Sequence, residues 1–491
     1  ENTRIMLEQQ QTISFSDYSS LYDLIIPKDN LLRQINDLVD FSFVYQELQD
    51  KYCHDNGRTA ESPIRMFKYL LLKVIYNISD VDVVERARYD MSFKYFLGLT
   101  PEETKLINPS SLTKFRRLRL KDMELLDLLI KKTVSIAIEV GVLKSKTVIV
   151  DATHTYSRSN PISAAKSLEY YCKTVIKVIN SIDDSMVLPE LPEEKKYSSI
   201  MKAAKAIVAT VEADAATANM PAVKERLNML KETIEDAEIR SITSKDEDAR
   251  IGHKTANSSF FGYKTHMAMS DERIITAATV TSGEKCDGQQ LPALIEKTES
   301  AGMEIDAIVA DTAYSSKSNI ELTKSKDIKL AAPLNPLVEK GNRQNTLNFE
   351  YNKDADMYVC PAGHMAVRKA REFRTNDKAH KNDRFRYFFD IDKCKVCPLR
   401  NGCYRPGAKS KCFNVTIKTE AQKELLEYQK TPEFAQLQRK RYKIEAKNSE
   451  LKNTLGYDRA LSYGLSCMEM QGALTIFAAN VKRILKLMHK A

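Results

Sequence analysis

A short apolar stretch in the first third of the chain constrains the fold most. Thr147–Thr153 reads Thr-Val-Ile-Val-Asp-Ala-Thr, so it is β-branched and apolar on both faces. Such a run predicts a central strand that is buried on both sides. It closes on Asp151, and a carboxylate at the end of a buried strand is costly unless a cation pairs with it. The alternative is that Asp151 only caps the junction between strand and loop.

A second apolar stretch repeats this design. Ile305–Asp311 reads Ile-Asp-Ala-Ile-Val-Ala-Asp and predicts another buried strand that closes on an aspartate. Because side chains alternate along a strand, Asp151 shares a face with Ile149, and Asp311 shares one with Val309. If the strands are neighbours in one sheet, both carboxylates lie at one edge. The other elements predicted nearby are strands Phe260–Met269, Arg273–Thr281 and Lys329–Pro333 and a helix Gln290–Ala301.

A late helix supplies a third acidic residue. Thr431–Glu433 predicts its start, because it offers an N-cap, a proline at the first helical position and an acid in the first turn. Gly456 predicts its end. Arg441, Glu445 and Lys452 form one stripe along it. The neighbouring stripe should face the core and consists of Leu437, Ile444 and Leu451.

Together, Asp151, Asp311 and Glu445 form a candidate carboxylate triad. Mg²⁺ and Mn²⁺ prefer carboxylate and water ligands, and two such ions can drive phosphodiester displacement. Arg441 and Lys452 are then placed to hold the phosphates of a DNA strand. Only Glu445 carries both an arginine and a lysine at these offsets. The acids that compete with the triad are Glu433, Glu450 and Asp458 near its third position and Asp306 near its second.

The charge distribution favours a polyanionic partner. The net charge is +9, and the basic residues are clustered. A helix predicted at Ser111–Lys121 combines an apolar seam (Leu112, Phe115, Leu118) with a basic outer face, as a DNA-reading helix would. The alternative is an ordinary solvated face. The basic residues that we expect to contact DNA are Lys114, Arg116 and Arg117 in this helix and Lys447 in the late one.

The later cysteines predict a separate metal site. Cys360 is followed by His364, and Cys394 and Cys397 form a Cys-x-x-Cys pair about thirty residues further on. Two close pairs of this kind can meet around one structural zinc ion. Residue spacing leaves the fourth ligand open between His364 and Cys403, and free thiols are the alternative to a zinc site.

Several classes of protein are disfavoured. The mean hydropathy is −0.40, and no run of about eighteen apolar residues occurs, so a membrane span is not expected. The first residues lack the pattern of a signal segment, which predicts an intracellular protein. The stretch 162–240 is rich in Ala, Lys and Glu and predicts a helical insertion.

The order of these elements resembles the DDE transposases of bacterial insertion sequences. The motifs that carry the resemblance are Thr147–Thr153, Phe260–Met269, Ala310–Ser315 and the spacing Arg441…Glu445…Lys452, together with Gly57-Arg58…Pro63 and Phe96–Leu99 in the helical N-terminal region. The family places a tyrosine three residues before the arginine, whereas this chain has Gln438. The resemblance covers most of the chain, from about residue 14 to Met488.

The resemblance implies an α/β fold with an RNase H-like core, a mixed sheet flanked by helices. The expected units are a helical N-terminal domain at 1–140 that binds DNA ends and dimerises, a catalytic core at 141–161, 248–335 and 416–491, a helical insertion at 162–247, and a Cys/His-rich basic insertion at 336–415.

The implied activity is metal-dependent cleavage of DNA strands at transposon ends, followed by strand transfer. Asp151, Asp311 and Glu445 would bind two Mg²⁺ or Mn²⁺ ions. The implied partners are double-stranded DNA, both transposon ends with inverted repeats and target DNA, and a second copy of the chain in a homodimer. The expected location is the bacterial nucleoid, in the cytoplasm. The open alternatives are a nuclease of the same fold that does not rejoin strands and an inactive DNA-binding descendant.

Overall fold

A mixed six-stranded sheet forms the centre of the protein. The computed structural model describes residues 16–52, 60–121, 123–182, 186–193, 196–239, 242–255, 257–339, 349–373 and 382–489. The order of the sheet is β4-β5-β1-β7-β8, with β6 also paired to β5. The strands are β1 Thr147–Tyr156, β4 Arg250–Thr255, β5 Ser258–Ser270, β6 Ile275–Ser282, β7 Ala307–Val309 and β8 Lys329–Ala331.

Strand direction changes across the sheet. β5 is antiparallel to β1, β4 and β6, whereas β1–β7 and β7–β8 pair in parallel. A helical crossover joins β7 to β8, whereas the chain between β1 and β7 also passes through β4, β5 and β6 before its last helical segment. The elements along these connections are η3 Asp287–Gln290 and α13 Leu291–Ser300 before β7, and η4 Thr312–Tyr314 and α14 Lys317–Ser325 after it.

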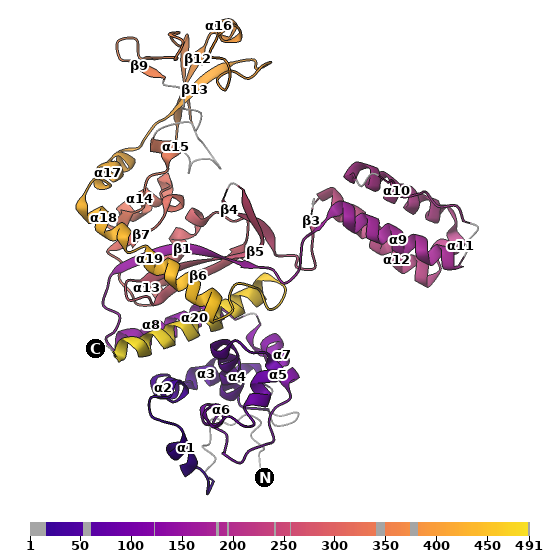
Figure 1. Cartoon of the computed structure of the whole chain (residues 1–491), viewed down its shortest axis with the longest axis vertical. Coiled ribbons are helices and arrows are strands. Elements are labelled where there is room, and N and C mark those ends of the chain that lie inside the picture. The colour runs from indigo at the N-terminus through magenta and orange to yellow at the C-terminus, as the bar shows by residue number, and fades with distance from the viewer. Residues whose placement is uncertain are drawn as a thin grey trace.

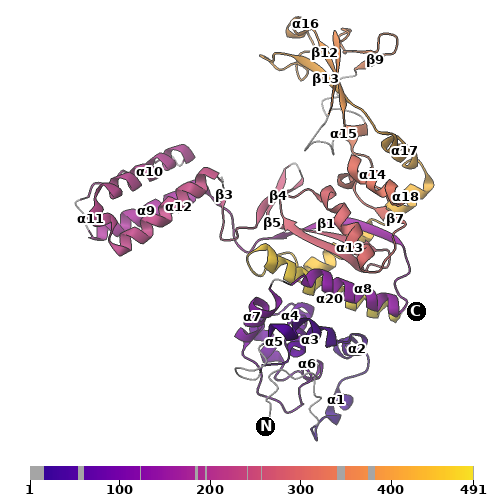
Figure 2. The same ribbon diagram turned by 180° about the vertical axis from the view of Figure 1, so that it is seen from behind.

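Helices cover both faces of the sheet. Val148 and Val150 of β1 pack into a cluster with α13 and α14, whereas Ile149 faces a larger cluster built from α8 Leu125–Glu139 and α20 Leu465–Met488. All three are buried, which confirms that the strand is covered on both sides. Figures 1 and 2 show α8 and α20 side by side along one face of the sheet.

A fully buried asparagine ties this helical layer to the sheet. The Asn480 side chain accepts the backbone N–H of Ile275 at 2.8 Å and donates to the Ile275 carbonyl at 2.7 Å. It also donates to Thr133 Oγ1 of α8 at 2.9 Å. One amide therefore joins α20, α8 and β6 with its polar atoms satisfied.

The N-terminal helices extend the same core. Phe67 and Phe477 lie edge to face with ring centroids 5.9 Å apart, and both are buried in the cluster that contains Ile149. The remaining helices of this region are α1 Ser20–Ile25, α2 Leu31–Leu38, α3 Ser42–Leu48, η1 Gln49–Lys51, α4 Pro63–Tyr76, α5 Asp80–Arg86, α6 Met91–Leu97, α7 Pro109–Phe115 and η2 Arg116–Leu120. Gly57-Arg58 of the quoted motif lies outside the described residues.

The stretch predicted to be a helical insertion forms a separate bundle, which Figure 1 shows projecting from the sheet. Its buried apolar residues make a cluster of their own. The two short strands at its base pair antiparallel. Its elements are β2 Ile162–Ser163, α9 Ala164–Ile182, α10 Tyr197–Ala213, α11 Ala215–Ala218, α12 Pro221–Ile239 and β3 Ile242–Thr243.

The segment between β8 and the late helices carries a second projection with small sheets. Strands β11, β12 and β13 form one antiparallel sheet, and β9 and β10 form another. Its elements are β9 Glu350–Asn352, β10 Met357–Val359, β11 Arg368–Glu372, β12 Arg384–Phe389, α16 Ile391–Lys395 and β13 Lys411–Thr416. α15 Pro336–Glu339 precedes it and α17 Glu420–Tyr428 follows it.

Two helices differ from the sequence prediction. The late helix is divided into α18 Pro432–Arg439, α19 Tyr442–Ser449 and a π-helical turn η6 Glu450–Thr454. The helix predicted at 111–121 ends in the π-helical turn η2, which shifts the register of its inner face. As a result, Leu118 is 60% exposed and Leu120 takes its place in the core.

Candidate active site

The two aspartates come from neighbouring strands. The prediction that Asp151 ends its strand is wrong, because β1 continues through Asp151 to Tyr156 by pairing with β5, whereas Asp311 lies just beyond the end of β7. β1 and β7 are parallel with Ile149 opposite Val309, so Asp151 and Asp311 follow at equivalent positions at the same edge. Both side chains are partly buried. Asp311 also accepts the Ala313 N–H at 2.8 Å, which caps η4. Asp311 thus has the capping role that was the alternative for Asp151. The cap uses Oδ1 of Asp311, so Oδ2 takes no part in it.

Crowding of like charges is visible in the ionisation of Asp151. The pKa of Asp151 is raised to about 6, chiefly by burial and to a smaller extent by the nearby carboxylates of Asp311 and Asp287. The Ala152 N–H and the Arg441 guanidinium act in the opposite direction. Burial and like charges outweigh these stabilising contacts. A bound cation would therefore lower the free energy of the ionised carboxylates.

Asp287 is an acidic residue of this site that the sequence patterns did not single out. It begins η3, directly after the loop that follows β6, and its carboxylate lies 2.8 Å from Lys264 Nζ and 3.7 Å from His266 Nδ1. His266 is fully buried, and burial lowers its pKa to about 4. Its position in the chain could have indicated this role. Asp287 follows β6, and β6 pairs with β5, the strand that also pairs with β1.

A buried tyrosine hydroxyl lies among these groups without a partner. Tyr314 is fully buried, and its OH has no hydrogen-bond partner among the residues that the structure describes. Burial raises the pKa of Tyr314 well above its usual value, and Asp287, Asp151 and Asp311 raise it further. An orphaned polar atom beside crowded carboxylates fits a site that takes up a further polar group or a hydrated ion.

Glu445 does not join the aspartates in this conformation. Its side chain is 61% exposed, and its carboxylate lies 3.9 Å from Arg441 on the same helix. The side chain of α19 that reaches Asp151 is instead Asn448, which donates from Nδ2 to Asp151 Oδ2 at 3.1 Å. Across the described ranges, no group of three or more His, Cys, Asp or Glu side chains is already arranged to hold a metal ion.

The other residues of the predicted stripe lie close to the site. Arg441 is near enough to Asp151 to lower its pKa. Lys452 Nζ lies 3.4 Å from the ring nitrogens of His154, and burial and the neighbouring Lys254 lower its pKa to about 8. Burial and Lys452 in turn lower the pKa of His154 to about 4, so that ring is neutral at pH 7.

Gln438 has a definite role at the family's tyrosine position. Its Nε2 donates to the carbonyl of Ala310 at 3.0 Å and to the carbonyl of Ala331. These carbonyls lie at the ends of β7 and β8. Gln438 therefore fastens α18 to the sheet edge one residue before Asp311.

The cysteines predicted to bind zinc lie apart from this site, in the second projection. Cys360, Cys394, Cys397 and Cys403 line one cavity, and His364 is at its exposed rim. Burial raises the pKa of the Cys394 thiol, and the sulfurs of Cys403, Cys360 and Cys397 raise it further.

Two segments of the chain match models of known protein families. Residues 20–118 match the family described as Transposase domain (DUF772), and residues 359–485 match the family described as Transposase DDE domain. Both matches support a DDE transposase of insertion-sequence type. The second match covers the cysteine-lined cavity and Glu445 but not the strands that carry Asp151 and Asp311. No curated protein sequence matches the chain.

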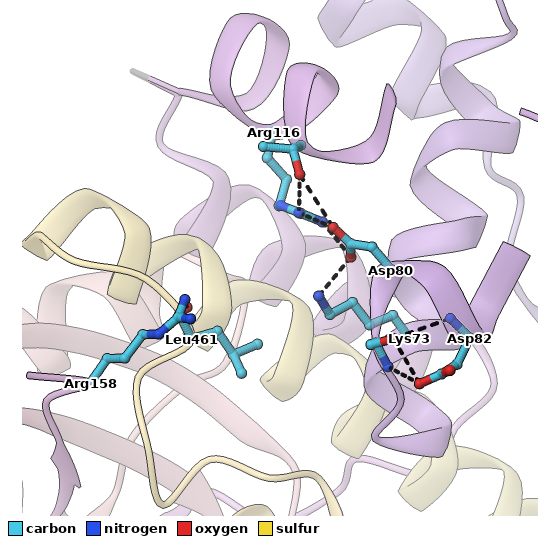
Figure 3. A network of polar contacts seen from close by, with 8 residues as sticks. Lys73, Asp80, Asp82, Arg116, Arg158 and Leu461 are labelled. Carbon is cyan, nitrogen blue, oxygen red and sulfur yellow. Dashed lines mark hydrogen bonds and ion pairs between the residues drawn. The ribbon is translucent and has the colours of Figure 1, made fainter. Parts of the chain in front are cut away.

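The transposase-domain match includes the basic stretch that we expected to bind DNA. Lys114 and Arg117 are exposed. Arg116 is turned inward instead, and Figure 3 shows it reaching Asp80, which Lys73 also contacts at 2.6 Å. Burial raises the pKa of Asp80, but hydrogen bonds from Arg116 and Lys73 lower it overall. Arg116 thus joins α7–η2 to α5.

The prediction that Lys447 contacts DNA is wrong for this conformation. Its side chain is 0% exposed, and Nζ lies 2.9 Å from Glu450 Oε2. The reason is helical spacing, because position 447 lies three residues after Ile444 and four before Leu451, and both of these are buried.

No described helix is both long and apolar enough to cross a bilayer.

The crowding at Asp151 predicts a stabilising substitution. Because its pKa is about 6 in the folded protein and 3.8 for the ordinary group, folding favours the protonated acid, and stability is lost as pH rises through this window. In chelator at pH 7, Asp151→Asn should therefore raise the unfolding free energy by about 1–3 kcal/mol. Urea unfolding at pH 4 and pH 7 measures this, and the gain should vanish at pH 4. A variant less stable than wild type at pH 7 would contradict it.

The two arginines of the basic stretch should behave differently. Arg116→Ala should lower the unfolding free energy by about 1–3 kcal/mol, because Asp80 loses a charged partner. Arg117→Ala should change it by less than about 0.5 kcal/mol. In binding titrations, Arg117→Ala should weaken DNA binding and reduce the salt slope by about 1. Equal stability loss in both variants would refute the distinction.

Proposed function

We propose that this transposase cleaves DNA strands at the ends of its mobile element and transfers them to target DNA with the help of divalent ions. The observation that carries the proposal is the parallel pairing of β1 with β7, which brings Asp151 and Asp311 to one sheet edge beside Arg441. Paired carboxylates with basic groups around them suit a metal-assisted reaction on phosphodiesters.

We further propose that the central sheet is an RNase H-like core. Three antiparallel strands, β6, β5 and β1, are followed by two parallel ones, β7 and β8, and helices cover both faces. Asp151 lies midway along the central strand β1, and Asp311 lies just beyond the end of its parallel neighbour β7. This is the position that the family resemblance assigns to the first two catalytic acids.

Asp151 and Asp311 would hold the metal, and Glu445 would complete the set. Residues three apart on a helix are neighbours on its surface, so Glu445 lies next to Asn448, which already contacts Asp151. In the proposed metal-bound state the Glu445 side chain would turn toward the aspartates, with α19 staying in place. When bound, divalent ions activate the attacking oxygen and stabilise the leaving oxygen.

The basic residues would position the DNA strand. Arg441 lies beside Asp151, and Lys452 lies in a partly buried position at the far end of the stripe. Burial lowers the pKa of Lys452 to about 8, so a phosphate beside it would favour its charged form. His154 would remain neutral and act only through its contact with Lys452.

The N-terminal helices would recognise the transposon ends, with Lys114 and Arg117 on DNA and Arg116 as an internal brace. Transposition brings two ends together, so we propose a homodimer. The joining step separates this function from a nuclease of the same fold.

The test is an assay with a pre-nicked end and a plasmid target. Wild type with Mg²⁺ should give joined products, whereas release without joining would indicate a nuclease. Asp311→Asn and Glu445→Gln should each reduce joining by at least ~100-fold, the order that removal of one charge-stabilising group costs. End binding should change little.

Asp306→Asn is the matched control. Asp306 is exposed and lies five residues before Asp311 on the same segment, so this variant should join DNA at the wild-type rate. Undiminished joining by Asp311→Asn would reject the proposed carboxylate set. If only Glu445→Gln joins DNA at the wild-type rate, the two aspartates stay in the proposed carboxylate set and Glu445 does not belong to it.

A further inference from the structure

The second projection has too little apolar core for its size. It spans residues 349–416, and among its described residues (349–373 and 382–416) the buried apolar ones are Ala366, Tyr387, Phe389 and Phe413. Figures 1 and 2 show that it extends away from the central sheet, so it borrows little burial from the rest of the chain. Units of this size need an additional stabilising link, such as disulfides or a structural metal ion.

Four cysteines from three separate segments converge at one end of this projection. Cys360 follows β10, Cys394 lies in α16 with Cys397 just after it, and Cys403 lies in the turn before β13. All four are free, partly buried and line one cavity. The walls of this cavity include the rings of Phe349 and Phe389, so the sulfurs face a largely apolar space.

Tight turns hold the backbone around each cysteine. The Cys360 N–H donates to the His364 carbonyl at 2.8 Å, and the Gly363 N–H donates back to the Cys360 carbonyl at 2.8 Å. Gly363 has φ +80°, a left-handed conformation that glycine adopts without strain. The turn after Cys397 is closed by Arg400 N–H to the Cys397 carbonyl at 3.1 Å. A Cys-x-x-Cys pair and a second cysteine-bearing turn are the usual frame of a zinc knuckle.

Exposure and strand register distinguish these four cysteines from two nearby residues, His364 and Cys412. The His364 side chain is exposed, whereas the four cysteines are partly covered. Cys412 is on β13 between Lys411, which lines the cavity, and Phe413, which is buried in the small core. Since neighbouring side chains on a strand point to opposite faces, Cys412 points away from the other four.

We propose that Cys360, Cys394, Cys397 and Cys403 bind one structural Zn²⁺ as four thiolates, and that His364 and Cys412 are not ligands. Binding would draw the sulfurs to about 2.3 Å from the ion in a tetrahedron. The ion would replace the missing apolar core by tying together three segments. Soft thiolate ligands favour zinc over the hard divalent ions proposed for the carboxylate site.

Lys411 is suited to support such a site. Four thiolates and one Zn²⁺ carry a net charge of −2, which needs cations nearby. Lys411 Nζ donates to the Cys403 carbonyl at 2.5 Å and lies close enough to Cys394 to lower the pKa of its thiol. Its loss should weaken the metal site without removing a ligand.

The first experiment measures metal in the full-length protein, purified under reducing conditions, by elemental analysis. We expect about one zinc per chain. Cys403→Ser should lower zinc affinity by more than the ~10–100-fold that loss of an outer-shell partner costs, whereas His364→Ala and Cys412→Ser should retain the metal. Zinc loss in His364→Ala with retention in Cys403→Ser would overturn the ligand assignment.

Because a ligand variant can fail to fold, a second experiment uses the wild-type protein. Replacement of zinc by Co²⁺ should give the spectrum of a tetrahedral four-thiolate site, and chelation should expose four additional reactive thiols. Hydrogen exchange should then increase in 349–416 but not in β1, β5 or α20. Absence of metal, or disulfides among these cysteines in the reduced protein, would reject the site.

The zinc proposal stands apart from the proposed reaction. Asp311→Asn should retain its zinc while losing strand joining, so failure of one proposal is distinguishable from failure of the other.

Discussion

The parallel pairing of β1 with β7 is the constraint on which the candidate active site depends. It aligns two strands of the same design, so that Asp151 within β1 is level with Asp311 just after β7. Between these two strands the chain runs through β4, β5 and β6 and then through α13, which covers one face of the sheet. The opposite face is held by α8 and α20 through Asn480, whose amide bonds both helices to β6. The carboxylates therefore stand on a scaffold that is rigid from both sides.

This arrangement has an electrostatic cost, since Asp151 is partly buried beside Asp311 and Asp287. Arg441 offsets part of that cost, and Lys264 compensates Asp287 at 2.8 Å. The Tyr314 hydroxyl remains unsatisfied among them. The site therefore combines a carboxyl group with a raised pKa and a buried hydroxyl group without a hydrogen bond to a described residue. Such unfavourable groups are typical of functional sites rather than of structural ion pairs.

Sequence patterns predicted the strands of the sheet, because buried strands have strong local signals. They nevertheless ended β1 at Asp151, although it continues to Tyr156, and they joined α18 and α19 into one helix. They failed where the outcome depends on packing. Arg116 and Lys447 have the same basic character as Arg117, yet Asp80 and Glu450 pair with them in partly or fully buried places. Leu118 is exposed because a π-helical turn shifts the register, which no period of 3.6 residues predicts. Asp287 came from a loop, where periodicity carries no information.

The position of Gln438 shows how the late helices restrict what Glu445 can do. Gln438 fastens α18 to the carbonyl groups of Ala310 and Ala331, while Ile444 and Leu451 are fully buried in the main core. The helix axis is thus fixed at both ends of the stripe. Asn448 contacts Asp151 and lies three residues from Glu445 on the same helix. Under the proposed carboxylate set, the exposed Glu445 side chain would have to turn toward the aspartates. Neutralisation of the crowded aspartates by a cation would remove the charge repulsion that opposes this rotation.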